Sequence, residues 1–395
     1  MIAFPTFDRR LVILLIGQAL AGSGSALAFL VTGFVGLELA PQPELATLPM
    51  STFIIGVALG SPLAPYLMAR LGRNAGHRLG LVIAATGSAF CLGALMQADF
   101  ILYATGTTIC GLGTAFQNQI RFTAAEAAPA EQKGIVHSWV LLCGLFAAII
   151  GPALASLGKD LLPTGSFTGS FFLFLLILLL VFLAFLFLPP LPVPHESEHS
   201  GRAQAGEVLR RPEFWLGASS GAVSFAVMTL LMAATPLQMT GMEHYSHSDT
   251  TSVIQSHIVA MFLPGLFSGA LLSMLGERRL MGLGLFLFLA CLIPGYIHES
   301  YLHYWWSLVL LGVGWNFLFL AGSTVISRSF AGPERFAAQG LNDLVVFGSQ
   351  TVASLAAGWL LYRVGWQALI LFSLPVLAVQ TLLVFFLPRG AKTGS

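Results

Sequence analysis

Charged residues are scarce in this sequence. Of its 395 residues, 9% are Asp, Glu, Lys or Arg and 56% are hydrophobic, whereas a soluble globular domain carries about 25% charged residues. The formal net charge is +1, which gives no reason to expect a nucleic acid partner. This composition excludes a water-soluble fold and predicts a protein embedded in a lipid bilayer.

Paired cysteines and nucleotide-binding motifs are also missing. The four cysteines are scattered through apolar runs without C-x-x-C spacing, so no disulfide framework is expected. No G-x-x-x-x-G-K-[ST] motif occurs, which excludes a nucleotide as the direct energy source. No catalytic triad or pair of acid/base carboxylates is visible. We therefore expect neither an enzyme nor a prosthetic group.

Apolar runs of about 20 residues, long enough to cross a bilayer, occur twelve times. The first run follows Asp8 and is far longer than the apolar part of a signal peptide, so we expect it to be retained. The sequence predicts an all-α membrane protein with twelve transmembrane helices. The predicted helices are 11–36, 46–70, 78–97, 101–123, 135–157, 167–189, 213–237, 251–275, 280–297, 302–325, 340–362 and 366–387.

The polar stretch 190–211 divides these helices into six and six. It predicts a cytosolic linker between two bundles, residues 1–189 and 212–395. With both termini inside, 16 of the 18 Lys and Arg residues lie on the inner side, and only Lys159 and Arg363 fall outside. This asymmetry predicts a bacterial inner-membrane protein with cytoplasmic termini.

The two predicted bundles resemble each other in sequence. The segment Gly111-Leu-Gly-Thr-Ala-Phe116 in the first matches Gly312-Val-Gly-Trp-Asn-Phe317 in the second. Two related six-helix bundles joined by a linker are typical of secondary transporters, which bind substrate near mid-membrane between the bundles.

At this level the chain resembles the major facilitator superfamily over its whole length. The stretch from Gly60 to Arg73 is similar to that superfamily's loop 2–3 signature, without its usual acidic residue. Gly151-Pro152 is similar to part of an antiporter motif, and Thr107 stands where many proton-coupled members carry an arginine. The resemblance implies two pseudo-symmetric six-helix bundles, and these departures argue against drug export or ordinary proton coupling.

Methionine and histidine form two ligand-like pairs in the second bundle. Met228 and Met232 lie at positions i and i+4 of one predicted helix, and His257 and Met261 share this spacing on the next. Thioethers and imidazole suit copper, and thioethers favour Cu(I). Methionine is also an ordinary core residue, but an ionisable residue inside a membrane helix is a functional candidate. The first bundle has no counterpart to this set.

The stretches Met228–Met239 and Gln255–Pro264 resemble those of CcoA-like copper importers, the CalT branch of the superfamily. The resemblance implies import of copper into the cytoplasm for assembly of cbb3-type cytochrome c oxidase. It further implies that Met228, Met232, His257 and Met261 bind the metal. Copper is then the transported substrate, and we expect a monomer.

Further side chains are candidates for weaker roles. A group at the outer end of the seventh predicted helix, and two thiols, could act as secondary or entry ligands for copper. Others could line the cavity or form a cytosolic gate, and Asp343 could instead cap the start of its helix. The secondary ligands are Met239, His244, His247, Cys110 and Cys143, and the cavity or gating residues are Gln117, Asn118, Arg121, Glu126, Asn316 and Asp343.

Alternative functions remain open on the sequence. The chain could carry a small organic solute such as riboflavin, with the amides of the fourth and tenth predicted helices and aromatic residues such as Trp315 lining the site. It could also export a drug or another solute. A metal sensor or assembly factor is a third alternative, for which the linker offers no partner-binding pattern.

Overall fold

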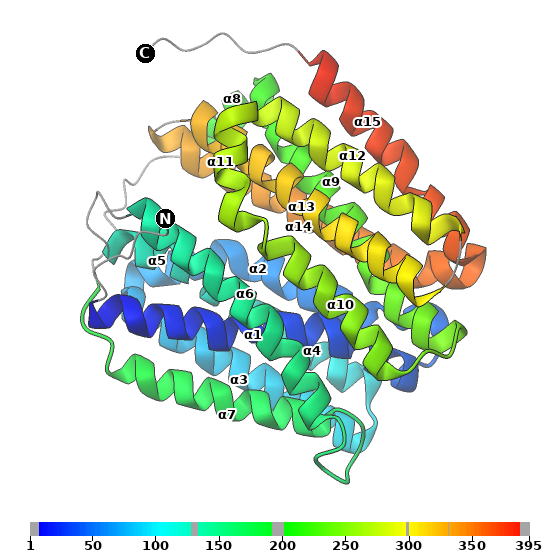
Figure 1. The fold of residues 1–395 in the computed structure, drawn as a ribbon. Helices are drawn as coiled ribbons and strands as arrows, with labels where there is room; N and C mark the ends of the chain where they lie inside the picture. The colour runs from blue at the N-terminus through cyan, green and yellow to red at the C-terminus, as the bar shows by residue number, and fades with distance from the viewer. Residues whose placement is uncertain (1–7, 128–132, 192–200, 298–299, 331, 388–395) are drawn as a thin grey trace.

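The computed structural model describes residues 8–127, 133–191, 201–297, 300–330 and 332–387 (Figure 1). Within these ranges the chain is helical and contains no strand. The helices form two adjacent groups, as the all-α prediction requires. The N-terminal group comprises α1 (Arg9–Leu39), η1 (Pro43–Leu45), α2 (Leu48–Leu71), α3 (Arg73–Gln97), α4 (Phe100–Gln117), α5 (Ile120–Ala127), α6 (Lys133–Gly158) and α7 (Thr168–Leu186).

The C-terminal group follows the same order of packing. Its α13 lies between α9, α10 and α12, as α4 lies against α2 and α3 in the first group. The group comprises α8 (Gly201–Arg210), α9 (Pro212–Pro236), η3 (Leu237–Met242), α10 (His247–Phe262), α11 (Gly265–Leu275), α12 (Glu277–Ile297), α13 (Tyr301–Ser329), α14 (Gly332–Leu371) and α15 (Ser373–Phe386).

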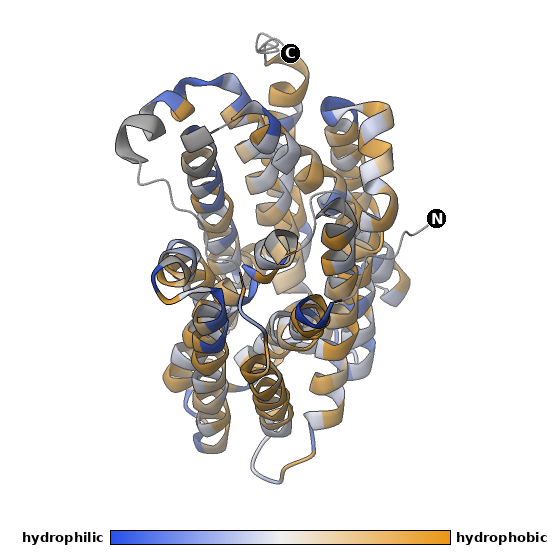
Figure 2. Cartoon of the chain, turned by 90° about the vertical axis from the view of Figure 1, so that its left-hand side faces the viewer, coloured by the Kyte–Doolittle hydropathy of each residue, from blue (hydrophilic) through white to orange (hydrophobic). Residues whose placement is uncertain are grey.

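Helices lie in all twelve predicted ranges. Eight described spans are long and apolar enough to cross a bilayer, and α10 with α11 forms a ninth across a 44° bend. One of the eight, Ala337–Phe386, holds two predicted helices because the chain turns at Gly365, whose φ of 83° favours glycine. Figure 2 shows that hydrophobic residues dominate most of these helices.

Two predicted helices are broken. The range 101–123 divides into α4 and α5, and 251–275 divides into α10 and α11 at Leu263 and Pro264. Proline has no backbone N–H, so Pro264 cannot complete the α-helical hydrogen bond to the residue four positions earlier. The break falls beside Met261, whose carbonyl accepts a hydrogen bond from Asn316 Nδ2 at 2.8 Å. The prediction of unbroken helices at these two places was wrong.

Paired glycines set the packing of α4 and α13 in the same way. A Cβ atom at Gly111 would collide with the backbone of α2, and one at Gly113 with α3. In the second group a Cβ at Gly312 would lie 2.7 Å from a backbone oxygen of α10, and one at Gly314 would crowd α12. The repeated sequence therefore corresponds to a repeated close approach of helices.

The predicted linker 190–211 contains the helix α8, which we did not predict from the sequence. The helix is held by Val208, which is fully buried in a small cluster with Phe214 and Ile326. Burying one such side chain stabilises by about 1.5–3 kcal/mol. Val208 and Leu209 are the only large apolar residues of this short helix, which is too few to show a helical period in the sequence.

Both ends of this linker are attached to the neighbouring helices. Asn74 Nδ2 on α3 donates to the carbonyls of Leu188 and Pro189, at 2.9 and 3.1 Å, and its Oδ1 accepts from the Leu191 N–H. At the other end, the Arg211 guanidinium lies 3.3 Å from the Glu334 carboxylate. Each group of helices thus holds its own end of the linker.

The two ends of the bundle differ in how the groups meet. We call the end with the start of α1, α5 and α8 the linker side, and the end with η1, η3 and Gly365 the distal side (Figure 1). On the distal side the Ser51 and Ser354 hydroxyls are 2.8 Å apart, and the Gly358 N–H donates to Thr47 Oγ1 at 3.3 Å. These contacts join α2 to α14 across the two groups.

Candidate functional site

The predicted methionine ligands on α9 are buried. Met228 is 2% exposed and Met232 is 3% exposed. Thr229 Oγ1 donates to the Met228 sulfur at 3.9 Å. Helix α9 packs mainly against α14 and α13, rather than against α10.

His257 on α10 faces α13. Its Nδ1 lies 2.7 Å from the Leu308 carbonyl oxygen. A carbonyl only accepts hydrogen bonds, so Nδ1 carries the proton and Nε2 of the neutral ring holds a free lone pair. Nε2 is buried and forms no hydrogen bond with any residue that the structure describes. The imidazole therefore has a fixed tautomer and one open acceptor position.

The four predicted ligands do not form a site that the geometry identifies. Met261 is 8% exposed and lies one turn from His257. The Met/Met pair is on α9 and the His/Met pair is on α10, and each of these helices packs mainly against helices other than its neighbour in this pair. Among the described residues, no group of three His, Cys, Asp or Glu side chains could hold a metal ion. That finding does not extend to thioethers, so the Met/His site stays a prediction.

The proposed entry residues lie on the distal side. Met239 is fully buried in η3, whereas His244 is exposed and adopts a φ of 59°. The His247 ring packs edge-on against Phe34 of α1, with 4.7 Å between ring centroids. His247 thus contributes to the contact between the two groups of helices.

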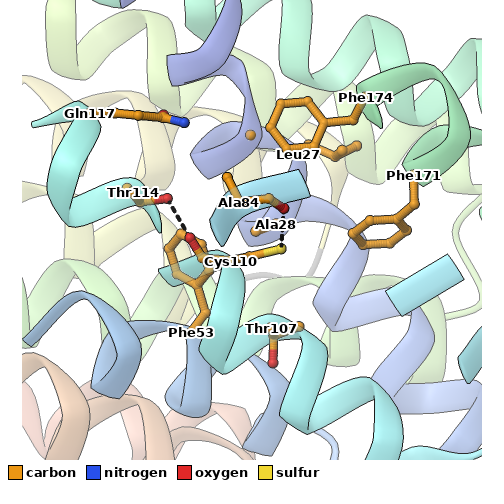
Figure 3. A pocket seen from close by; sticks show the side chains of 11 residues that line it. Leu27, Ala28, Phe53, Ala84, Thr107, Cys110, Thr114, Gln117, Phe171 and Phe174 are labelled. Carbon is orange, nitrogen blue, oxygen red and sulfur yellow. Dashed lines mark hydrogen bonds between the residues drawn. The ribbon is translucent and has the colours of Figure 1, made fainter. Parts of the chain in front are cut away.

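The two candidate thiols lie in the N-terminal group, on α4 and α6. Cys110 Sγ donates to the Ala84 carbonyl at 3.8 Å and lines a cavity of about 10 Å³ (Figure 3). That volume is close to the minimum for one water molecule. Cys143 is buried on α6. Helix α6 packs against α10, the helix that carries His257 and Met261.

The three candidate amides have different surroundings. Gln117 lines the same small cavity inside the N-terminal group (Figure 3), and Asn118 is exposed. Asn316 lies in the C-terminal group and contacts α10. Its Nδ2 donates to the Met261 carbonyl, while its Oδ1 is buried and forms no hydrogen bond with any described residue.

The candidate gating charges belong to both groups. Arg121 on α5 and Asp343 on α14 are close enough for an electrostatic interaction. Asp343 does not cap its helix, because α14 begins at Gly332, and it accepts a hydrogen bond from Asn342 Nδ2. Glu126 lies in α5, but its side chain is outside the described residues.

An aromatic cluster gathers residues from four helices of the C-terminal group. Trp315 and Phe319 of α13 lie one turn apart with nearly parallel rings, 5.2 Å between centroids and 21° between planes. Phe225 of α9 meets both rings edge-on at 5.2 Å. Phe262 of α10 and Phe347 of α14 complete the cluster, which we call the aromatic cluster.

The aromatic cluster lies where the two groups of helices approach each other. A Cβ atom at Gly144 of α6 would lie 3.3 Å from the Phe262 ring. The four phenylalanines are only partly buried, whereas Trp315 is 6% exposed. The Trp315 Nε1–H is buried and forms no hydrogen bond with any residue in the described ranges. A buried polar group without a partner costs about 1–3 kcal/mol.

The family model for the Major Facilitator Superfamily matches residues 14–273 and, in a second match, residues 218–395. The riboflavin transporter RfnT of Brucella anthropi is 35% identical to this chain over 389 residues, which cover 97% of each protein. The chain belongs to the Major Facilitator Superfamily.

Other relatives of this superfamily chain are more distant. The uncharacterized MFS-type transporter YdeG of Bacillus subtilis is 27% identical, with 92% of this chain and 88% of that protein covered. Among solved structures, the human organic anion transporter MFSD10 has a TM-score of 0.71 at 14% identity, covering 96% of this chain and 100% of that one. The fucose:proton symporter FucP of E. coli has a TM-score of 0.64 at 16% identity, covering 96% and 98%. At these identities the structures support the fold alone.

Membership of the superfamily confirms the broader resemblance in the sequence. The narrower resemblance to CcoA-like copper importers finds no support among these relatives. RfnT, which matches 97% of this chain in sequence, is a riboflavin transporter. The i, i+4 methionine and histidine pairs are short patterns. Similarity over 97% of the chain carries more information about its branch than they do.

Proposed function

We propose that this chain is a secondary transporter that carries riboflavin, or a closely similar flavin, across the bacterial inner membrane by alternating access. The observation that carries the proposal is the 35% identity to a riboflavin transporter over 97% of both chains. The aromatic cluster supports it, because flat aromatic solutes bind by stacking and edge contacts with such rings.

The orientation follows from the distribution of basic residues. With most Lys and Arg on the linker side, that side faces the cytoplasm. The distal side then faces outward, and it is the side closed by the contacts between α2 and α14. These contacts support an inward-facing state, from which substrate leaves toward the cytoplasm.

Uptake by purified protein in proteoliposomes tests the proposed substrate. Vesicles are given labelled riboflavin or labelled copper in parallel, and empty vesicles measure leakage. We expect riboflavin to accumulate and excess unlabelled riboflavin to compete. Accumulation of copper without riboflavin would replace this proposal with the copper import that the Met/His pairs predict.

A variant of His257 refines the comparison between the two substrates. If copper is not the substrate, His257→Gln keeps a side chain able to bond the Leu308 carbonyl and leaves riboflavin uptake within about twofold. A complete loss of copper accumulation in that variant, in vesicles that accumulate copper with the native chain, would instead support a metal-ligand role.

A further inference from the structure

A comparison of matching positions on α4 and α13 shows which residues the close packing of helices requires and which it does not. In the repeat, Gly111 and Gly113 correspond to Gly312 and Gly314, and all four allow close approach of neighbouring helices. The next two residues are Thr-Ala on α4 and Trp-Asn on α13. The same scaffold is therefore built with small residues in one group, so it does not require Trp315.

The polar atoms at these two positions also differ between α4 and α13 in whether they are hydrogen-bonded. Thr114 Oγ1 bonds the Cys110 carbonyl of its own helix at 3.0 Å, so its polar atom is satisfied. Trp315 Nε1 and Asn316 Oδ1 are both buried, and neither forms a hydrogen bond within the described chain. One is a donor and the other an acceptor. Both side chains meet α10 at consecutive residues, Phe262 and Met261.

The partly exposed rings indicate that the aromatic cluster is not a closed core. Elsewhere in the same group Phe214 and Phe288 are fully buried. Phe225, Phe319 and Phe347 keep part of their surface free although they contact one another or Trp315. A ligand that covers these rings removes apolar surface from water at about 25 cal/mol per Å².

We propose that the aromatic cluster is the binding site for the tricyclic ring of the flavin. In the state described, the flavin ring packs on the partly exposed Phe225, Phe319 and Phe347. When the rings that cover Trp315 and Asn316 move apart, the Trp315 indole N–H donates to a carbonyl oxygen of the flavin ring, and Asn316 Oδ1 accepts from its imide N–H. This inference rests on the proposed function. It adds that recognition of the ring belongs to the C-terminal group, while Asn316 Nδ2 holds the break between α10 and α11.

Binding of flavin to the purified protein tests this assignment. The probes are riboflavin and lumiflavin, which has the ring without the sugar-alcohol chain, and the readout is quenching of flavin fluorescence on titration with protein. Lumiflavin is expected to bind and to compete with riboflavin, whereas ribitol is not. Lumiflavin should compete because the aromatic cluster contacts the flavin ring and not the sugar-alcohol chain.

Two substitutions separate the hydrogen bond from the stacking. Trp315→Phe keeps an aromatic ring and removes the N–H, and we expect the Kd to rise about 3–10-fold. Trp315→Leu also removes the flat surface, and we expect a rise of about 10–100-fold. Trp306→Phe is the matched control, since Trp306 lies on the same helix and is 52% exposed, and its Kd is expected not to change.

The outcomes distinguish the two proposals. If the native chain binds and transports riboflavin but both Trp315 variants bind it with unchanged Kd, the assignment of the ring site is wrong and the transport function stands. If the native chain neither binds nor transports any flavin, the proposed function fails and the ring site with it. The thermal unfolding midpoint of each variant is measured alongside, and if Trp315→Leu does not fold, Trp315→Phe alone decides.

Discussion

Helices α4 and α13 occupy matching positions in the two groups and differ in the residues directly after their paired glycines. In α4 these residues are small, and Thr114 satisfies its hydroxyl on its own helix. In α13 they are Trp315 and Asn316, each with a buried polar atom that no described residue satisfies. Close helix packing is therefore the same in both copies, while at the two positions after the glycines only α13 has an aromatic ring and buried polar atoms without a described partner.

The largest effect is expected from breaking the close packing that the two helices share. Gly111→Ala places a Cβ against the α2 backbone, which cannot move as a flexible side chain can. Overpacking of this kind costs about 1–3 kcal/mol or more, so we expect little folded protein, measured as the monodisperse fraction and thermal midpoint in detergent. Gly348→Ala on α14 is the control, because nothing lies within 4 Å of its Cβ position. Equal midpoints for the two variants would contradict the packing argument.

The second effect comes from making α13 resemble α4. The double variant Trp315→Thr, Asn316→Ala keeps Gly312 and Gly314, so the scaffold is retained. We expect riboflavin uptake into proteoliposomes to fall more than about tenfold, because stacking and edge contacts are both lost. Thr114→Ala on α4 is the counterpart and should change uptake less than about twofold. A similar loss in both variants would show that the two helices do not differ in function.

A third effect tests where the two groups join. Gly358→Leu places a side chain at a Cβ position 2.9 Å from the Glu44 carbonyl and from Thr47 Oγ1, inside the distal contact. A cost of about 1 kcal/mol to the closed form shifts the equilibrium about fivefold toward opening. The readout is labelling by an impermeant maleimide of a cysteine introduced by His247→Cys, since the four native thiols are buried. Unchanged labelling would mean that this contact does not hold the distal side shut.

The smallest effect is expected from the ion pair on the same side. Arg363 lies 3.2 Å from the Glu44 carboxylate, but its side chain is 63% exposed. Exposed pairs contribute between zero and about 1 kcal/mol and are screened by salt. Arg363→Gln should lower the thermal midpoint only slightly, and about 1 M salt should remove the difference. If Arg363→Gln increased maleimide labelling of the His247→Cys cysteine as much as Gly358→Leu does, the charge and not the packing would close the distal side.

Much of the fold could be predicted because apolar length and repeated glycines act locally. The break before Pro264 could have been expected from the proline alone, but its stabilisation by Asn316 depends on a helix about 50 residues further along the chain. Helix α8 depends on burial of Val208 against Phe214 and Ile326, which only the folded chain brings together.

The candidate site depends on contacts between helices, which spacing along one helix does not specify. The i, i+4 spacing of Met228 with Met232, and of His257 with Met261, fixes a face on each helix. It does not say that the two faces meet, and α9 and α10 pack mainly on other helices. Trp315 was recognised beside its glycines, but nothing in the sequence distinguishes its partners Phe225, Phe262 and Phe319 from the other phenylalanines, of which the chain has 31 in all.

The attachment of the linker at both ends limits how far the two groups can separate. Asn74 holds Leu191 against α3, and α8 begins at Gly201. The roughly ten peptide steps between these residues span at most roughly 35 Å when extended. The connection between the two groups therefore has a definite maximum length. Progressive shortening of residues 192–200 should leave transport intact until the connection is too short for the two groups to move apart, and removal of a few more residues should then abolish transport.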